Sequence, residues 1–247
     1  ENTKGFPRLK EIARVREAYA KARAAGAELV LTPELSLCGY PPRDLLEQPD
    51  FLRANRQALA AVAKSVKGAG LVVGCLEANP ARSGRPVFNA AVLLHRGKVV
   101  ASRAKTLLPT YDVFDEHRHF EPASENAPIK FKGRRLGLTI CEDAWNDEAF
   151  WGKQLYQADP VASQVKAGAD LLLNISASPF EVGKLAFRRG LVAGHARRHG
   201  LPFLYCAQVG GNDELVFDGY SFAVDARGRT LAAGKGFVED LLVVDSE

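Results

Sequence analysis

The sequence predicts an α/β fold with mixed strand pairing, and two observations support this prediction. Helical patterns alternate with short buried-strand patterns in the first part of the chain, and strand-rich hairpins interrupt them. No low-complexity linker divides the 247 residues, which are enough to bury one substantial core. We therefore expect a single domain over residues 1–247.

The first half of the chain alternates helix and strand patterns and ends in a hairpin. The helices carry apolar residues at helical spacing, and the strands are short β-prone apolar runs. The expected elements are a helix at 9–25, a strand at 28–32, a turn-rich loop at 33–42, a helix at 49–66, a strand at 71–76 and a hairpin at 87–101.

The second half repeats the alternation and then becomes richer in strands. Its first strand, at 135–140, is a small apolar run that ends in Cys141. The elements expected after it are a helix at 160–167, a strand at 170–175, a basic helix at 184–199, a strand at 203–209, a tight Gly-Gly-Asn turn at 210–212 and short strands up to Val244.

Composition and charge exclude several classes of protein. The net charge of +4 is too small to argue for a nucleic-acid partner, and no run of 18 apolar residues predicts a membrane span. The start of the chain, at residues 1–4, lacks the apolar core of a signal peptide. Four scattered cysteines without zinc-type spacing predict a reduced, cytoplasmic protein. Methionine is absent even at position 1, so we expect that this chain is not the complete native product, either because residues are missing at its start or because methionines are missing from the sequence.

Three ionisable residues, Glu34, Lys105 and Cys141, each follow a predicted buried strand. If these strands share one sheet with their ends aligned, the three side chains converge on one pocket. Each residue taken alone has an ordinary explanation. A lone cysteine is more often a small core residue, the glutamate can be a turn acid, and the lysine can be a solvated strand end.

Together, these three residue types suit acyl transfer. A thiol is a weak nucleophile until a base removes its proton, and a half-buried carboxylate has its pKa raised towards that task. A lysine charge favours the thiolate and can stabilise the oxyanion of a tetrahedral intermediate, which is typically worth about 3 kcal/mol.

The segments around these residues resemble the signature segments of the nitrilase, or carbon–nitrogen hydrolase, superfamily. They are Thr32-Pro33-Glu34-Leu35, Lys105-Thr106-Leu107-Leu108-Pro109 and Ile140-Cys141-Glu142-Asp143-Ala144-Trp145. Within that superfamily, nearly the whole chain is similar to the glutaminase domains of glutamine-dependent NAD+ synthetases. The segments that carry this likeness are residues 39–46, 111–116, 174–180 and 208–219.

The resemblance implies a nitrilase-like α-β-β-α sandwich with mixed sheets and assigns roles to individual residues. Glu34 would be the general base, Lys105 the oxyanion stabiliser and Cys141 the nucleophile. Glu116 matches a second glutamate that supports the lysine and the substrate amide. The residues implied to hold the amino-acid end of glutamine are Tyr111, Glu142, Ser178 and Lys184.

The resemblance also implies cofactors and partners. The glutaminase step requires no cofactor or metal, and its substrate is L-glutamine. Ammonia would pass to a C-terminal synthetase domain of the same polypeptide, which uses ATP and Mg2+ to convert deamido-NAD+ into NAD+. The Ser-Gly-Gly phosphate loop of that domain does not occur in these residues. We expect a homo-oligomer with no membrane or nucleic-acid partner.

Two alternative functions remain open. The family has a strand before its first helix, and this chain starts within or just before that helix, so an idle assembly or regulatory domain is one alternative. A stand-alone amidase, nitrilase or carbamoylase with another substrate is the second alternative.

Histidines and arginines elsewhere receive plain interpretations. The pairs His117/His119 and His195/His199 have spacings that a metal could use, but no third ligand is evident, so solvated or core histidines are expected. The basic helix is expected to present its arginines to solvent or to another subunit. These arginines are Arg188, Arg189, Arg197 and Arg198.

Overall fold

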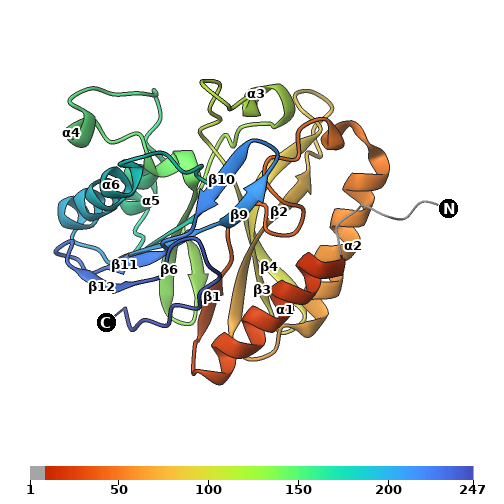
Figure 1. The fold of residues 1–247 in the computed structure, drawn as a ribbon, viewed down its shortest axis with the longest axis horizontal. Coiled ribbons are helices and arrows are strands. Elements are labelled where there is room, and N and C mark those ends of the chain that lie inside the picture. Colours follow the sequence, from red (N-terminus) through yellow and green to blue (C-terminus); the bar gives the residue numbers. More distant parts are fainter. Residues whose placement is uncertain (1–8, 247) are drawn as a thin grey trace. The chain divides into compact units, whose positions relative to one another are not determined.

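The computed structural model describes residues 9–246, which form two compact units, one ending at Pro122 and the other beginning at Ala123. Each unit contains one main sheet with helices packed against it (Figure 1). The α/β class with mixed sheets is therefore confirmed. One domain over residues 1–247 stays a prediction, and the strand expected before the first helix lies outside the described residues.

The sheet of the first unit has four strands in the order β1-β2-β3-β4. These strands are β1 (Leu29–Leu31), β2 (Gly70–Ala78), β3 (Val87–His95) and β4 (Lys98–Ala104). The β1–β2 pair is parallel, and the next two pairs are antiparallel. β1, β2 and β4 consequently run in one direction, and their C-terminal ends lie at the same edge of the sheet.

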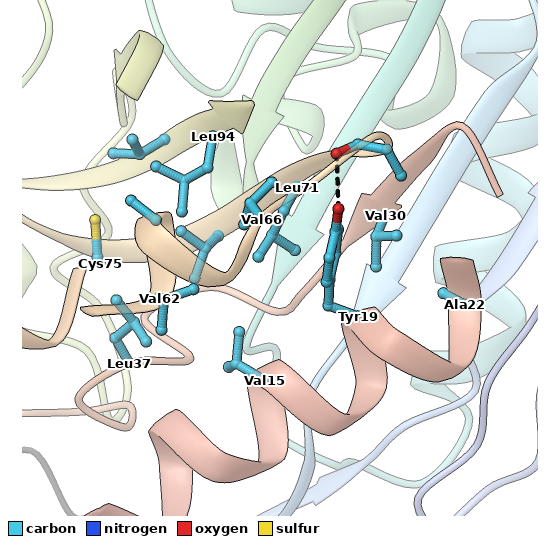
Figure 2. Close-up of a cluster of buried hydrophobic side chains, with 14 of the residues drawn as sticks. Val15, Tyr19, Ala22, Val30, Leu37, Val62, Val66, Leu71, Cys75 and Leu94 are labelled. Carbon is cyan, nitrogen blue, oxygen red and sulfur yellow. Dashed lines mark hydrogen bonds between the residues drawn. The ribbon is translucent and has the colours of Figure 1, made fainter. Parts of the chain in front are cut away.

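Two helices, α1 (Leu9–Ala24) and α2 (Pro49–Ser65), pack against this sheet because each carries an apolar face. Val15 and Tyr19 of α1 point towards the buried residues of the sheet (Figure 2). The Tyr19 hydroxyl lies at the edge of this apolar contact and donates to the Ala69 carbonyl at 3.0 Å (Figure 2). Two shorter helices complete the unit, namely the 3-10 helix at Arg43–Glu47 and α3 (Glu116–His119).

The sheet of the second unit has six strands in the order β12-β11-β8-β7-β6-β5. Its centre is parallel and consists of β6 (Arg134–Ile140), β7 (Leu171–Ser176) and β8 (Phe203–Ala207). The outer strands pair antiparallel and are β5 (Ile129–Phe131), β11 (Phe222–Val224) and β12 (Thr230–Ala233). The C-terminal ends of the three parallel strands therefore share one edge.

Helices α5 (Pro160–Lys166) and α6 (Lys184–His199) pack against this second sheet. Val161 of α5 and Val192 of α6 join Leu172 and Phe203 in its hydrophobic core. The remaining elements of the unit are the 3-10 helix at Cys141–Ala144, α4 (Glu148–Trp151) and the hairpin of β9 (Val209–Asn212) and β10 (Leu215–Asp218).

Two expectations for the C-terminal region are wrong. The Gly-Gly-Asn sequence is not a turn, because Gly210 and Gly211 pair with β10 as part of β9, and the chain reverses after Asn212. Among the described residues, no strand follows Ala233, so the short strands do not continue to Val244. Alternating apolar residues alone do not make a strand when no neighbouring strand accepts their backbone hydrogen bonds.

Candidate active site

Glu34 lies in a segment that leaves β1 and crosses β2 at very close range. A Cβ atom built on Gly74 of β2 would overlap the backbone of Pro33 and Leu35, and it would lie 2.7 Å from the Glu34 carbonyl carbon. The backbone of Leu37 also donates to the Gly74 carbonyl at 3.1 Å. The absence of a side chain at position 74 therefore allows this segment to hold Glu34 against the sheet.

Lys105 directly follows β4, and its side chain joins two glutamates. Its ammonium donates to Glu34 Oε1 at 2.8 Å and to Glu116 Oε1 at 2.7 Å. The lysine side chain is 1% exposed and the Glu34 side chain 0% exposed. A charge buried this deeply is tolerated only when it is paired and hydrogen-bonded, so the three groups depend on one another.

Two neutral side chains complete this acid–base cluster. Asn89 of β3 donates from Nδ2 to Glu34 Oε1 at 2.7 Å, and the Tyr40 hydroxyl donates to Glu116 Oε1 at 2.7 Å. The Asn89 carbonyl also accepts a hydrogen bond from the Lys105 backbone at 2.8 Å. The Asn89 amide therefore orients the Glu34 carboxylate, and the Tyr40 phenol orients the Glu116 carboxylate.

Burial changes the acidity of Glu116. Removal from water raises its pKa to about 7, and the nearby Glu34 carboxylate pushes it in the same direction. Lys105 and the hydrogen bond from Tyr40 oppose the shift but do not cancel it. Glu116 therefore exchanges a proton close to neutral pH.

Cys141 directly follows β6 of the second unit and has an unusual backbone. Its φ of 43° lies in the left-handed region, which residues with a side chain rarely adopt. The buried Asp143 accepts a hydrogen bond from the Ile140 backbone at 3.0 Å, and Asn174 donates to the Cys141 carbonyl at 3.3 Å. These bonds hold the sharp change from strand to 3-10 helix, which places the thiol at the C-terminal edge of the parallel strands.

Two hydroxyl groups form a hydrogen-bonded chain that ends at this thiol. Ser176, the last residue of β7, donates from Oγ to Cys141 Sγ at 3.2 Å. The Tyr205 hydroxyl of β8 donates to Ser176 Oγ at 2.7 Å. All three side chains are buried.

The expectation that the basic helix presents its arginines to solvent is wrong for Arg188. This side chain is 1% exposed and donates from Nη2 to Asp218 Oδ2 at the end of β10. Burial lowers the pKa of the Arg188 guanidinium, but Tyr205, Asp218 and Cys141 raise it, and the net shift is upward. The helical pattern shows which residues share a face of α6. It does not show that β10 brings an acidic partner, Asp218, to Arg188 on that face.

The implied substrate-binding residues fall in both units. In the second unit Glu142 is buried and accepts a hydrogen bond from the Tyr156 hydroxyl at 2.7 Å, and Ser178 is buried just beyond β7. The Lys184 ammonium at the start of α6 lies 5.7 Å from the centre of the Trp145 ring. Tyr111 belongs to the first unit, where it is exposed and packs edge-on against Phe114.

The structure brings some predicted residues together and corrects two premises. Glu34, Lys105 and Glu116 form one cluster in the first unit, as β1 and β4 end at the same edge of its sheet. The condition that the strands before Glu34, Lys105 and Cys141 share one sheet is not met, because β6 belongs to the sheet of the second unit. The strand before Lys105 is also partly exposed instead of buried, since β4 lies at an edge.

The sequence interpretation missed Tyr40, Asn89, Ser176 and Tyr205. Asn89 had a detectable signal, because it is the one amide in the apolar strand at Val87–His95. A polar side chain inside such a strand must find a buried partner. Tyr40 and Ser176 lie inside segments that carry the family likeness, whereas Tyr205 has no comparable local signal.

The other cysteines and the histidine pairs give no sign of a second reactive thiol or of a metal site in the part of the chain that the structure describes. Burial raises the pKa of the Cys206 thiol to about 12 and raises the pKa values of Cys38 and Cys75 as well. His195 is a core residue whose Nε2 lies 2.8 Å from the Ala144 carbonyl. Within residues 9–246, no group of three or more histidine, cysteine or acidic side chains is arranged to hold a metal ion. No helix in this part of the chain is long and apolar enough to cross a membrane.

An α/β fold with a buried thiol at the end of a parallel strand and a buried carboxylate–lysine cluster has the features of an amide-cleaving hydrolase. The chain belongs to the carbon–nitrogen hydrolase family, whose profile matches residues 8–246. A structure of a mutant of the amidase from Nesterenkonia sp. AN1, which shows the result of Michael addition of acrylamide at the active-site cysteine, matches with a TM-score of 0.78 and 27% identity. The match covers 98% of this chain and 90% of that one, and the nitrilase-like fold is confirmed.

Other relatives are longer than this chain. It is 43% identical over 231 residues to a glutamine-dependent NAD(+) synthetase of Synechocystis sp., which covers 92% of this chain and 41% of the relative. A solved glutamine-dependent NAD+ synthetase from Acinetobacter baumannii matches with a TM-score of 0.84 and 30% identity, covering 96% and 43% of the two chains. The chain thus spans about two fifths of these relatives, in agreement with the resemblance seen in the sequence.

Proposed function

We propose that this chain is a glutamine amidohydrolase that cleaves the side-chain amide of L-glutamine and releases glutamate and ammonia. Two findings together carry the proposal. The carbon–nitrogen hydrolase profile matches residues 8–246, and the longer relatives of this chain are described as glutamine-dependent NAD(+) synthetases. Such a synthetase requires a source of ammonia, and a carbon–nitrogen hydrolase can provide it.

In the proposed reaction, Glu34 takes the proton of the Cys141 thiol, and the thiolate attacks the amide carbon of glutamine. Lys105 stabilises the negative charge that develops on the amide oxygen. Glu34 returns the proton to the departing ammonia, which leaves a glutamyl thioester on Cys141. Glu34 then activates a water molecule that hydrolyses the thioester and releases glutamate. Glu116 holds Lys105 in place through the hydrogen bond at 2.7 Å.

The proposed substrate contacts follow the charges of glutamine. The buried Glu142 carboxylate suits the α-amino group, and Lys184 suits the α-carboxylate. Ser178 and Tyr111 would add hydrogen bonds to the same end of the substrate. This step requires side chains alone, while ATP and Mg2+ would serve a synthetase domain of the same polypeptide. We also propose a cytoplasmic homo-oligomer that acts on deamido-NAD+ through that domain.

The test is glutamate release by the natural full-length protein and by its Cys141→Ala variant. We expect release from the unaltered protein and loss by more than a thousandfold in the variant, because the nucleophile is removed. Cys75→Ala is the matched control, since that thiol is buried in the first unit and has a raised pKa. Equal release from the unaltered protein and the Cys141 variant would overturn the proposal.

A stand-alone amidase with another substrate is the second candidate. It is favoured by the match to the Nesterenkonia amidase, because this match covers 90% of that protein's chain. Comparing glutamine with small aliphatic amides such as propionamide separates the two. Preferential hydrolysis of the aliphatic amide would select the second candidate. An idle domain would hydrolyse neither compound, and glutamine would not protect Cys141 from iodoacetamide.

A further inference from the structure

The two hydroxyl groups behind Cys141 are aligned by the register of three parallel strands. Thr139 of β6 lies opposite Asn174 of β7, which lies opposite Tyr205 of β8. Ser176, two residues beyond Asn174, lies on the same face of the sheet and beside the end of β6, where Cys141 follows. The serine and tyrosine positions are therefore fixed by the backbone hydrogen bonds of the sheet.

The two hydrogen bonds point in one direction, towards the sulfur. Ser176 has a single hydroxyl hydrogen and gives it to Cys141 Sγ, so its oxygen can act only as an acceptor towards other groups. The Tyr205 hydroxyl donates to that oxygen at 2.7 Å. In a buried chain of this kind each bond polarises the next, which strengthens the donor at the sulfur end.

The charged groups of the second unit around this chain come from three elements. Glu142 and Asp143 lie on the 3-10 helix that begins at Cys141, and their carboxylates accept hydrogen bonds from Tyr156 and the Ile140 backbone. Arg188 of α6 is the positive group, and it interacts electrostatically with both Tyr205 and Cys141. Its buried ion pair with Asp218 holds the guanidinium in position.

We propose that Ser176 and Tyr205 form a donor relay that orients the Cys141 sulfur and stabilises its thiolate. Ser176 contacts the reacting sulfur itself, and Tyr205 is a positioning residue that acts through Ser176. This inference rests on the proposed role of Cys141 as the reactive thiol, and it adds a source of thiolate stabilisation that does not involve Glu34 or Lys105.

The experiment measures alkylation of Cys141 by iodoacetamide in the natural full-length protein, across neutral to alkaline pH, by peptide mass spectrometry. In this reaction the sulfur forms a bond to carbon and iodide leaves, so the rate reports the thiolate without any need for glutamine. We expect Ser176→Ala to move the midpoint of the profile to higher pH and to slow the reaction at neutral pH about tenfold, the usual effect of losing a hydrogen bond to a charged group.

Tyr205→Phe should shift the profile in the same direction by a smaller amount, because the serine hydroxyl remains but loses its donor. The double variant should shift no further than Ser176→Ala alone, as expected when the tyrosine acts only through the serine. Tyr19→Phe is the matched control for loss of a buried tyrosine hydroxyl, which there bonds to backbone carbonyls of the first unit. Ser221→Ala, which removes the acceptor of a hydrogen bond donated by the Ala207 backbone N–H, is the control for the serine.

Profiles of Ser176→Ala and Tyr205→Phe that coincide with that of the unaltered protein would overturn the relay. Equal shifts in the control variants would overturn it as well, because they would reveal a general loosening. If Ser176→Ala does not fold, the isosteric Tyr205→Phe decides alone. Shifted profiles in a protein that does not hydrolyse glutamine would support the relay and overturn the proposed function, so the two can fail separately.

Discussion

Lys105 donates to Glu34 at 2.8 Å although the two residues are 71 positions apart and both side chains are almost completely buried. The pair links the segment after β1 to the end of β4, and these two strands are the outermost strands of the first sheet within residues 9–246. Because both groups lie in a low-dielectric interior, this ion pair compensates part of their lost hydration, together with the bonds that Glu116 makes to Lys105 and Asn89 makes to Glu34. The stability of the first unit and the orientation of a candidate base therefore depend on the same contact.

We expect Lys105→Met to lower the free energy of unfolding by about 3–5 kcal/mol, because it leaves two buried carboxylates without a cation. Lys21→Met is the matched control, as Lys21 pairs with Glu17 at 2.7 Å while both side chains are 65% exposed. Its loss should stay below about 1 kcal/mol. Urea denaturation followed by circular dichroism measures both values, and similar losses in the two variants would contradict the buried ion pair.

Replacing Asn89 should affect both stability and catalysis. Asn89→Leu removes the amide that donates to Glu34 at 2.7 Å, and we expect a loss of about 1–3 kcal/mol together with at least a tenfold lower kcat for glutamine. Asn55→Leu removes another buried amide, which donates to the Leu76 carbonyl at 2.9 Å. That control should lose similar stability but keep its kcat. An unchanged kcat in Asn89→Leu would show that the amide does not position the base.

Gly74→Ala should disturb the segment that carries Glu34. The added methyl group would meet backbone atoms of Pro33 and Leu35, which cannot move aside as a flexible side chain can. We expect a loss of about 1–3 kcal/mol or more and a fall in glutamate release. In α6, a methyl group at Gly194 meets no atom closer than Asp147 Oδ2 at 3.8 Å. Gly194→Ala should therefore be neutral or stabilise the helix by up to about 1 kcal/mol, and thermal melting of both variants tests the difference.

Glu116 should give stability a distinct pH dependence. Its pKa is raised from an ordinary 4.5 to about 7 by burial, so the folded protein holds this proton more tightly than the unfolded chain. Its contribution to folding is complete below about pH 4.5 and is lost as the pH rises to about 7. Glu116→Gln removes this titration, so the variant should gain stability relative to the unaltered protein by on the order of 1 kcal/mol or more across that range.

Denaturation at several pH values measures this difference. Glu17→Gln is the control, because the pKa of Glu17 is lowered by Lys21. In both states that carboxyl is almost fully ionised above about pH 5.5, because its ordinary pKa is 4.5 and its pKa in the folded protein is lower, so the difference between Glu17→Gln and the unaltered protein should be flat from about pH 5.5 to pH 7. A flat difference for Glu116→Gln as well would show that the Glu116 carboxyl is not held in its neutral form by burial.

The sequence predicted most helices and strands because their signals are local. The helices at Leu9–Ala24 and Pro49–Ser65 show a repeating apolar face within a few turns, and Gly26 marks the end of the first. The wrong predictions lie where a distant partner decides. Gly210 and Gly211 became strand residues because β10 pairs with them, and the residues after Ala233 remained outside any sheet.

The sequence by itself determined the α/β class, the family, and the positions of Glu34, Lys105 and Cys141 after strands, because these follow from periodicity and from short motifs. Only the tertiary structure decided which side chains meet. Asn89 reaches Glu34 across 55 positions, Tyr205 reaches Ser176 across 29, and Arg188 finds Asp218 across 30. Strand register and the need of each buried polar group for a hydrogen bond decide these partners. The residues adjacent in the sequence predict neither of them.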